Sequence, residues 1–466
     1  MILIASSLYL RHDRKQRERM KPYSPLATLL IAASLRQRGH DVAFFDATLA
    51  SGVEDFAAML SKTSPAIVGI LEDNFNFLTK MCTVTMRNAT LAMVSAAAAA
   101  GCRVAVNGSD SSDHPQLYLD AGADVVLSGE ADVSFPALAD AWAASGATAL
   151  SEIMGAIVAD GRGGLVRTPS VRGIGDLDAL PLPAWDLIDV AAYRDAWMTA
   201  HGRFSWNMIS SRGCPYGCNW CAKPIFGRRY SQRSPECVAD EIAQLRERVN
   251  PDHIWFADDI FGLTASWITR FAAEVSRRGV RTPFLIQCRA DLLGAAVVEA
   301  LGDAGAEEVW LGVESGSQRI VDAMDKGTTV DEVRAATRAL KAHGIRVGWF
   351  LQLGYPSETW EDLVRTRDLV RDERPDDVGV SVAYPLPGTR FHAMVKAQLG
   401  ERQNWQDTDD LAMLFHGTYI TSFYRTIRDA LHDEVCTGKH DDARWAELAR
   451  DERQYRSPEP LIAAAG

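Results

Sequence analysis

Short apolar runs alternate with amphipathic segments along the first part of the chain. Continuous apolar runs are typical of buried strands, and apolar residues repeated every three or four positions are typical of helices packed on a sheet. The pattern predicts strands over residues 2–6, 41–45, 66–71, 103–106 and 124–127, and helices over 25–38, 53–62 and 89–100. This alternation predicts a mostly parallel, doubly wound (Rossmann-like) α/β sheet with helices on both faces. Such sheets bind ligands outside the carboxyl ends of their strands.

A second alternating series follows a proline-interrupted stretch at residues 173–197, which lacks a regular period and predicts a linker. The series predicts strands over 207–210, 253–257, 284–287, 309–313, 346–351 and 377–382, and helices over 235–248, 265–278, 294–304, 330–343 and 359–374. Strand–helix pairs of this length favour a partial (β/α)6 barrel. We expect an N-terminal domain over 1–145, a linker region over 146–203, the barrel over 204–395 and a small helical C-terminal region over 396–466.

Composition and charge narrow the classes of function. The chain has 466 residues, of which 47% are hydrophobic and 24% charged, and this is ordinary for a soluble globular protein. Its formal charge of −12 argues against a nucleic-acid partner, because little basic surface would neutralise phosphates. No segment approaches the roughly 20 apolar residues that span a bilayer, and the apolar start lacks the basic region of a signal peptide. We therefore expect a cytoplasmic protein with no membrane partner.

Three of the eight cysteines, Cys214, Cys218 and Cys221, lie close together after the first strand of the second series. Thiolates at spacings of four and three residues can wrap one small iron–sulfur cluster from a single loop, and neighbouring glycines let that loop turn tightly. The alternative is a structural zinc site, but zinc prefers four ligands, usually in two CxxC pairs, and His201 is a weak fourth candidate. We therefore expect a cluster with three cysteine ligands and one open iron.

The spacing CxxxCxxC after the first strand of such a series resembles the signature of the radical S-adenosylmethionine (SAM) superfamily. The resemblance implies that the open iron of a 4Fe–4S cluster binds the amino and carboxylate groups of SAM. It also implies that an electron from a donor such as flavodoxin or ferredoxin cleaves the sulfonium and yields a 5′-deoxyadenosyl radical. Trp220, just before the third cysteine, stands where the family places an apolar residue against adenine.

The resemblance extends to the ends of the later strands, where members of the family contact SAM. The SAM-binding residues that it implies are Ala257, Asp258, Asp259, Arg289, Glu314, Ser315 and Gly354. A guanidinium at Arg289 is suited to pairing with the SAM carboxylate. Residues 256–259 depart from the family's usual Gly-Gly-Glu, and the two aspartates have an alternative role as a helix cap before Thr264.

The N-terminal domain resembles the cobalamin-binding domain that precedes the barrel in the class B type of radical SAM enzymes. The cobalamin-binding residues that the resemblance implies are Pro25, Leu26, Asn74, Phe75, Gly108, Ser109, Ser128, Gly129 and Glu130. The Asp-x-His-x-x-Gly motif that supplies an axial histidine in cobalamin methyltransferases is absent, so we expect no protein histidine on cobalt. One alternative is a domain that kept the fold and lost the cofactor. For residues 72–77 the alternative is a helix N-cap region, with Asp73 or Asn74 as the cap.

The resemblance as a whole implies radical SAM chemistry on a small-molecule substrate. The leading hypothesis is cobalamin-dependent methyl transfer to an unactivated carbon. The alternative is a radical rearrangement, cyclisation or other bond formation by the same barrel, with the cobalamin-type domain empty or in another role. A cofactor-bearing sensor without turnover would require degenerate SAM-contacting positions, and these positions are not degenerate.

Overall fold

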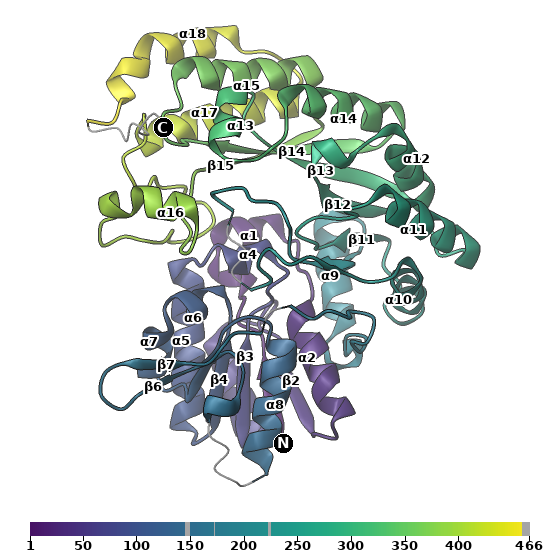
Figure 1. The fold of residues 1–466 in the computed structure, drawn as a ribbon, viewed down its shortest axis with the longest axis vertical. Helices are drawn as coiled ribbons and strands as arrows, with labels where there is room; N and C mark the ends of the chain where they lie inside the picture. The colour runs from purple at the N-terminus through teal and green to yellow at the C-terminus, as the bar shows by residue number, and fades with distance from the viewer. Residues whose placement is uncertain (145–149, 172, 222–224, 459–466) are drawn as a thin grey trace. The chain divides into compact units, whose positions relative to one another are not determined.

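The computed structural model describes residues 1–144, 150–171, 173–221 and 225–458. The chain divides into two compact units, and Figure 1 labels their elements. The first unit consists of Met1–Cys214, Lys223–Asp259 and Asn404–Asp409. The second unit consists of Pro215–Ala222, Ile260–Gln403 and Asp410–Gly466.

A seven-stranded sheet, in the order β2-β1-β3-β4-β5-β6-β7, forms the centre of the first unit. Its strands are β1 (Ile2–Ala5), β2 (Val42–Phe45), β3 (Ile67–Leu71), β4 (Arg103–Asn107), β5 (Val125–Leu127), β6 (Ala156–Ala159) and β7 (Leu165–Arg167). The first five strands pair in parallel, as the sequence predicts, whereas β6 and β7 add an antiparallel edge. These last two strands escaped prediction because their apolar runs are only four and two residues long and each is followed by a charged residue.

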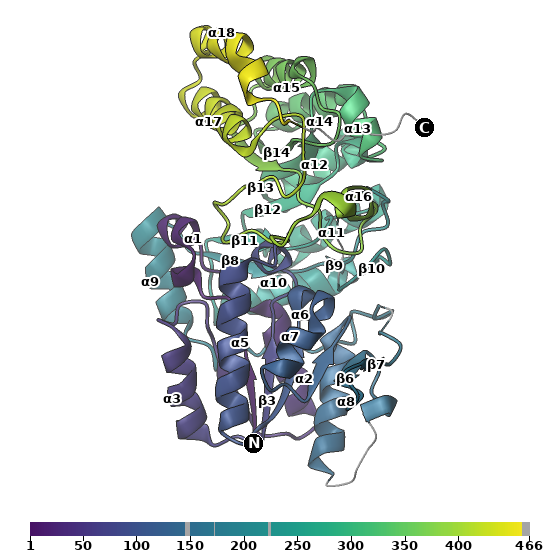
Figure 2. The ribbon, with the colours of Figure 1, turned by 90° about the vertical axis from the view of Figure 1, so that its left-hand side faces the viewer.

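Helices cover both faces of this sheet, which confirms the doubly wound arrangement. The helices of the first unit are α1 (Arg14–Arg19), α2 (Leu26–Gln37), α3 (Val53–Thr63), α4 (Phe77–Lys80), α5 (Val84–Ala99), α6 (Ser109–Asp113), α7 (Pro115–Asp120), α8 (Ala131–Ala143), α9 (Val190–His201) and α10 (Pro235–Arg248). Figure 2 shows α3 and α5 on one side of β3, and α2 and α8 on the other. Val68 of β3 packs in one core with Phe56 of α3, whereas Gly69 leaves room on the other face for the ring of Phe135 from α8. Burial on both faces explains why these strands are continuous apolar runs.

The first unit also contains the start of the second strand–helix series. Here β8 (Ser205–Met208) and β11 (His253–Phe256) pair in parallel. The short strands β9 (Ser211–Arg212) and β10 (Ser231–Gln232) lie between them in the chain and pair antiparallel. Helix α9 lies in the stretch that the sequence predicted as a linker. The helix was missed because few apolar residues, such as Trp197, mark its buried side.

Four parallel strands form the sheet of the second unit, namely β12 (Phe284–Cys288), β13 (Ala306–Glu314), β14 (Arg346–Leu353) and β15 (Asp377–Val382). The helices beside them are α11 (Ala265–Arg278), α12 (Ala295–Ala304), α13 (Gln318–Ala323), α14 (Val330–Ala342) and α15 (Trp360–Glu373). Figure 1 shows α12, α14 and α15 along one side of the sheet. Alternate strand residues face these helices, and Trp349 of β14 donates its indole N–H to Thr337 of α14 at 3.2 Å. We call the opposite side of the sheet the inner face.

Side-chain caps fix where the helices of the second unit begin. Thr264 accepts a hydrogen bond from the N–H of Trp267 at the start of α11. Thr329 and Glu332 form a reciprocal capping box at the start of α14. The sequence carries these signals, and the predicted bounds of both helices agree with the structure to within one residue.

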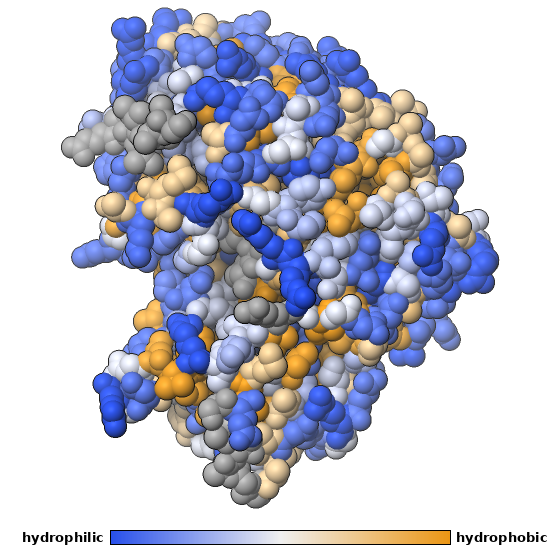
Figure 3. All heavy atoms as spheres, viewed as in Figure 1, coloured by the Kyte–Doolittle hydropathy of each residue, from blue (hydrophilic) through white to orange (hydrophobic). Residues whose placement is uncertain are grey.

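The C-terminal region is helical, as expected, and contains α16 (Arg390–Val395), α17 (Thr421–Thr437) and α18 (Asp442–Asp451). Glu434 of α17 pairs with Arg371 of α15 at 2.6 Å, which fastens α17 to the helical side of the sheet. Figure 3 shows mainly hydrophilic side chains over α18, at the top of the view. Among the helices in the described part of the chain, none combines the length and apolar composition that crossing a membrane requires.

Candidate cofactor sites

The three motif cysteines occupy the loop that follows β9. Cys214 ends the first segment of the first unit, and Cys218 and Cys221 belong to the second unit. All three are free of disulfides and partly exposed. Gly213 has a φ of +75°, and a Cβ there would overlap the carbonyl oxygen of Arg229, so only glycine fits. No three His, Cys, Asp or Glu side chains gather in a metal-binding arrangement among the described residues, so the cysteine ligands are assigned from the motif.

Asp258 holds the backbone just ahead of the cysteine loop. Its carboxylate is 2% exposed and accepts hydrogen bonds from the N–H groups of Ser210 and Ser211, at 2.8 and 2.9 Å, and from the Ser210 hydroxyl at 2.5 Å. Burial raises the pKa of Asp258 to about 7, although these hydrogen bonds oppose the rise. Thr264, rather than either aspartate, caps the following helix.

The residues on either side of Asp258 have different surroundings. Ala257 is buried, and its N–H donates to the carbonyl of Met208 at 2.9 Å, which extends the pairing of β8 with β11. The carboxylate of Asp259 lies 2.6 Å from the ammonium of Lys80, next to the loop that follows β3. Of the three residues, Asp258 is therefore the one that contacts the start of the cysteine loop.

Arg212 is a buried cation on β9 that no sequence pattern marks. Its guanidinium donates to Glu130 at 2.7 Å and to both oxygens of Asp132, at 2.9 and 3.1 Å. The side chains of all three residues are at most 6% exposed. The rings of Phe75 and Phe226 lie 5.2 and 5.5 Å from the guanidinium carbon. This cluster joins the strand that leads into the cysteine loop to the start of α8 in the N-terminal domain.

Asn219 anchors the cysteine loop within the second unit. Its backbone N–H donates to the carbonyl of Met324 at 3.0 Å, and its amide donates to the carbonyl of Ala323 at 2.7 Å and to Asp325 at 3.1 Å. The hydroxyl of Tyr355 donates to the amide oxygen at 3.0 Å. The N–H of Phe391 donates to the Asn219 carbonyl at 3.0 Å. Together these five hydrogen bonds fix the peptide between the second and third cysteines.

The structure brings together Trp220, which is expected near adenine, and the turn at Gly354, another residue that is expected to bind SAM. Trp220 packs against a buried cluster that contains Tyr355 and Phe391, and its indole N–H is buried without a partner in the described part of the chain. Gly354 has a φ of +79° and donates its N–H to Glu358 at 2.7 Å. Burial raises the pKa of Glu358 to about 8. This corner therefore combines an apolar wall with a left-handed glycine turn that is held by a buried carboxyl.

Arg289 lies at the end of β12 and is 6% exposed. Its guanidinium donates to both oxygens of Asp291, at 2.9 and 3.1 Å, and to the carbonyls of Lys326 and Gly327, at 2.9 and 3.3 Å. The ring of Tyr216 lies 3.7 Å from its central carbon. Since a guanidinium has five N–H groups, these four bonds hold Arg289 firmly and leave one donor for an anionic ligand.

Lys326 is a second buried cation, close to Glu314 at the end of β13. The ammonium lies 2.7 Å from the Glu314 carboxylate, and both side chains are at most 7% exposed. Burial works to lower the pKa of Lys326, but Glu314 and, more weakly, Cys218 raise it overall. Glu314 has a φ of +66° where the register of β13 with β14 shifts, and the hydroxyl of the adjacent Ser315 lies 3.2 Å from that of Thr366. Sequence reasoning missed Lys326, because it comes from a turn twelve residues after Glu314 and fits no motif.

Polar side chains meet at the carboxyl ends of β3 and β4 in the first unit. Glu72 accepts a hydrogen bond from the N–H of Ser109 at 3.1 Å and covers Gly108, where a Cβ would overlap its carboxylate. Asn74 donates to the amide oxygen of Asn107 at 3.0 Å. The Asn74 amide oxygen and the Ser109 hydroxyl are buried without a partner among the described residues. Buried polar atoms of this kind point to a missing polar ligand, so they fit a cofactor at this edge of the sheet.

The start of α2 and the loop after β3 support each other. Pro25 precedes α2 and Leu26, its first residue, is buried. Asp73 accepts from the N–H of Ala27 at 3.1 Å and so fixes the helix start. The cap of α4 is Asn76, not Asp73 or Asn74.

The turn after β5 contacts residues that flank the two edge strands, which the sequence did not predict. The hydroxyl of Ser128 lies 3.0 Å from that of Ser170, and Gly129 has a φ of +81°. The second oxygen of Glu130 accepts from the N–H of Ile174 at 3.1 Å, so its carboxylate is occupied on both sides. Phe75 stacks on Phe226 with ring centroids 5.0 Å apart.

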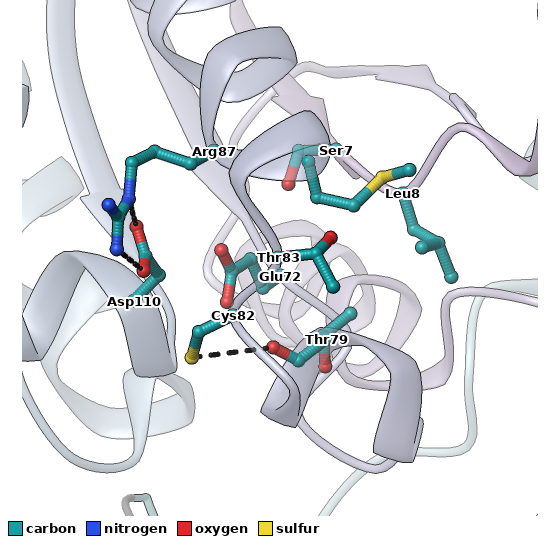
Figure 4. Close-up of a pocket in the computed structure, with 9 residues that line it drawn as sticks. Ser7, Leu8, Glu72, Thr79, Cys82, Thr83, Arg87 and Asp110 are labelled. Atoms are coloured by element: carbon teal, nitrogen blue, oxygen red, sulfur yellow. Dashed lines mark hydrogen bonds and ion pairs between the residues drawn. The ribbon is translucent and has the colours of Figure 1, made fainter. Parts of the chain in front are cut away.

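A small cavity opens beside Glu72 in the first unit (Figure 4). It is lined by Ser7, Leu8, Glu72, Thr79, Cys82, Thr83, Met86, Arg87 and Asp110. Burial, with repulsion from Asp110, raises the pKa of Glu72 to about 8. Arg87 donates to both oxygens of Asp110, at 2.5 and 2.7 Å, and the Thr83 hydroxyl is buried without a partner among the described residues. The cavity lies where the sequence predicted a ligand crevice, at the carboxyl ends of β1 and β3.

Two family models match the chain. The radical SAM superfamily model matches residues 208–370, and the B12 binding domain model matches residues 18–139. An uncharacterized methyltransferase of Pyrococcus horikoshii is 28% identical over 79% of this chain and 77% of its own length. A hopanoid C-3 methylase of Methylococcus capsulatus is 27% identical over 81% of this chain and 70% of its own length.

Further matches include a relative named as a cyclase and a solved structure with the same fold. An anaerobic magnesium-protoporphyrin IX monomethyl ester cyclase of Rubrivivax gelatinosus is 29% identical over 48% of this chain and 40% of its own length. The radical SAM methyltransferase TsrM of Kitasatospora setae, solved with cobalamin and a [4Fe-4S] cluster, shares the fold with a TM-score of 0.71 at 18% identity, over 86% of this chain and 76% of that one.

The two domain matches and the cysteine motif agree on the cofactors. A radical SAM domain uses a 4Fe–4S cluster and SAM, and a B12 binding domain uses cobalamin. The predicted fold class and cofactors are thereby confirmed. The chain belongs to the radical SAM superfamily, in the group that carries an N-terminal B12 binding domain.

Proposed function

We propose that this protein is a cobalamin-dependent radical SAM methyltransferase that acts on an unactivated carbon of a small molecule. The observation that carries the proposal is the pairing, in one chain, of a CxxxCxxC barrel with a B12 binding domain whose strand ends carry buried, unpartnered polar atoms. Two relatives that match 79% and 81% of the chain are named as a methyltransferase and a methylase. When bound, the three cofactors supply a methyl group and a radical that removes hydrogen from carbon.

We assign the cluster to Cys214, Cys218 and Cys221. A thiolate ligand must be held in place to keep one iron open. Asp258 supports this role from one side, since it fixes two backbone N–H groups ahead of the loop. Asn219 supports it from within the loop.

The SAM site in this proposal is the set of strand ends in the second unit. Arg289 offers one remaining donor, and Lys326 offers an ammonium that Glu314 orients. A cation held in advance by its neighbours loses little freedom when it binds a carboxylate. Trp220 and Gly354 supply the apolar corner for the adenine.

The cobalamin site in this proposal is the carboxyl edge of the sheet in the first unit. Asn74 and Ser109 offer their unpartnered oxygens to the corrin or its side chains, beside Gly108. The other cobalamin contacts that we propose at this edge are Pro25, Leu26, Phe75, Ser128, Gly129 and Glu130. Two of them also serve the protein's own contacts, since Phe75 stacks on Phe226 and Glu130 pairs with Arg212. No histidine is among these residues, so cobalt is expected to lack a protein imidazole.

The domain limits that we propose remain 1–145, 146–203, 204–395 and 396–466. A radical SAM enzyme needs a reductant, and we propose a flavodoxin or a ferredoxin as the electron donor. Free cysteines and a reducible cluster fit a cytoplasmic location, where thiols stay reduced. The acidic net charge argues against a nucleic-acid substrate.

The test is anaerobic reconstitution with iron, sulfide and hydroxocobalamin, followed by incubation with SAM that carries a deuterated methyl group. We expect 5′-deoxyadenosine, S-adenosylhomocysteine and a corrinoid that carries the labelled methyl group. Cys214→Ala should abolish 5′-deoxyadenosine, whereas Cys436→Ala, an exposed cysteine outside the motif, should retain it. Normal 5′-deoxyadenosine from Cys214→Ala would refute the cluster assignment.

The second candidate function is radical bond formation or cyclisation, which the similarity to a cyclase favours. The same experiment separates the two functions. If 5′-deoxyadenosine forms but no corrinoid is retained and no label leaves SAM, methyl transfer is wrong and the second candidate stands.

A further inference from the structure

Two aromatic side chains lie side by side on the inner face of the second unit's sheet. The rings of Trp310 on β13 and Phe350 on β14 have centroids 4.7 Å apart and planes tilted by 32°. Phe350 is 36% exposed, although strand phenylalanines are usually buried. Leu311 and Leu351, the next residues on the same strands, are 0% and 1% exposed on the helical side. The strands are therefore well packed, and the exposure belongs to the inner face alone.

Glycines on the neighbouring strands make room for the two rings. Gly348 pairs with Trp310, and a Cβ at Gly348 would overlap the indole. Gly379 pairs with Phe350, and a Cβ at Gly379 would lie 3.2 Å from that ring and 3.3 Å from the indole. Gly312 pairs with Phe350 on its other side. With no side chains at these three positions, both rings lie over backbone and remain open on their outer side.

The indole is held in this orientation by a polar contact at its edge. Trp310 donates its N–H to Glu308 at 2.5 Å, and Arg346 lies 3.6 Å from the other oxygen of that carboxylate. A ring held in advance by its neighbours loses little freedom on binding a ligand. The pair is therefore a preformed apolar surface.

This surface is continuous with the charged residues at the end of β13. Gly312 lies between Trp310 and Glu314 on β13 and pairs with Phe350 on the inner face. A Cβ at Gly312 would lie 2.5 Å from the ammonium of Lys326 and 2.9 Å from the carboxylate of Glu314. The aromatic pair and the residues that we assign to SAM binding are therefore neighbours, with only Gly312 between them.

We propose that Trp310 and Phe350 form an aromatic platform that binds a flat, apolar part of the small-molecule substrate. The proposal rests on the proposed function, because a substrate attacked by the SAM-derived radical must lie on the face that carries SAM. Aromatic faces favour flat π-systems, which stack on them, over rounded apolar groups of similar size. The substrate class is therefore a small molecule with a planar, uncharged ring system next to the reacting carbon.

The platform can be tested by equilibrium dialysis of the reconstituted holoenzyme with 1-pyrenemethanol, which is flat and uncharged. The variants are Trp310→Leu and Phe350→Ala, alone and together, with Ile420→Ala as the control because Ile420 is a 41% exposed apolar side chain of the same unit. We expect the double variant to bind the probe about tenfold more weakly or worse, a change of about 1.4 kcal/mol. Ile420→Ala should bind it as the wild type does, and Trp310→Phe, which keeps a ring, should retain most of the binding.

A second probe, 1-adamantanemethanol, is apolar but rounded and should bind the wild type more weakly than 1-pyrenemethanol. Iron content and the far-ultraviolet circular dichroism spectrum should match the wild type in all variants, which shows that each is folded and keeps its cluster. The platform is refuted if the wild type does not bind 1-pyrenemethanol, if the double variant binds it equally well, or if both probes bind alike. Failure of the wild type to transfer the labelled methyl group would overturn the proposed function, while the dialysis would still decide on the platform.

Discussion

Replacing Arg212 with alanine should be among the more costly single substitutions in the first unit. The guanidinium is the partner of two buried carboxylates, Glu130 and Asp132, at 2.7 and 2.9 Å. Removing it leaves both carboxylates buried, and breaking a buried ion pair in this way costs about 3–5 kcal/mol. The loss should displace β9 and so lower iron retention as well as stability.

The cost should also depend on pH. In the wild type, burial raises the pKa of Glu130 overall, although Arg212 opposes the rise. Without the arginine the folded-state pKa of Glu130 should rise further. A carboxyl whose pKa is raised by folding holds a proton in the folded state that the unfolded state has already released, so stability falls as pH rises through that interval. The variant should therefore lose more stability at pH 8 than at pH 5.5.

Urea unfolding of the anaerobic, reconstituted protein at the two pH values measures both effects. Arg277→Ala is a matched control, because Arg277 pairs with Glu274 while 63% exposed, and such pairs contribute at most about 1 kcal/mol. Adding Glu130→Gln and Asp132→Asn to Arg212→Met should recover much of the loss, since no buried charge then remains. A loss below about 1 kcal/mol at pH 8 for Arg212→Ala, or equal losses at both pH values, would refute the reasoning.

Three further substitutions have separate expected outcomes. Glu358→Gln should flatten the fall in stability between pH 5 and 8, because burial raises the pKa of Glu358 to about 8 and glutamine does not titrate; urea midpoints that keep the wild-type slope would contradict this. Asn219→Ala should remove three side-chain hydrogen bonds, each worth about 1 kcal/mol, and lower the iron bound per chain, whereas wild-type iron content would show that the loop holds without them. Gly348→Ala should displace the Trp310 indole and lower the unfolding temperature by several degrees, and an unchanged thermal transition would mean that the ring moves freely.

The periodicity of the sequence determined most of the architecture. Strands that are buried on both faces must be continuous apolar runs, and helices packed on them must be amphipathic, so β1 to β5 and β11 to β15 are visible without a structure. The predicted starts of α11 and α14 are confirmed, and in both helices a threonine cap, Thr264 or Thr329, acts through residues close by in the chain. Segments with little burial, namely β6, β7 and α9, were missed because weak burial leaves weak periodicity.

Among the candidate site residues too, local patterns were visible in the sequence and long-range contacts were not. The cysteines are recognisable from the sequence because one loop must supply three ligands at close spacing, and the spacing itself is the signal. The partners of those residues come from distant parts of the chain, and only folding brings them together. Arg212 meets Glu130 across 82 residues, and Asn219 meets Tyr355 across 136. Tertiary structure alone decided these contacts, because a lone charge or amide in the sequence carries no sign of the partner that will satisfy it once it is buried.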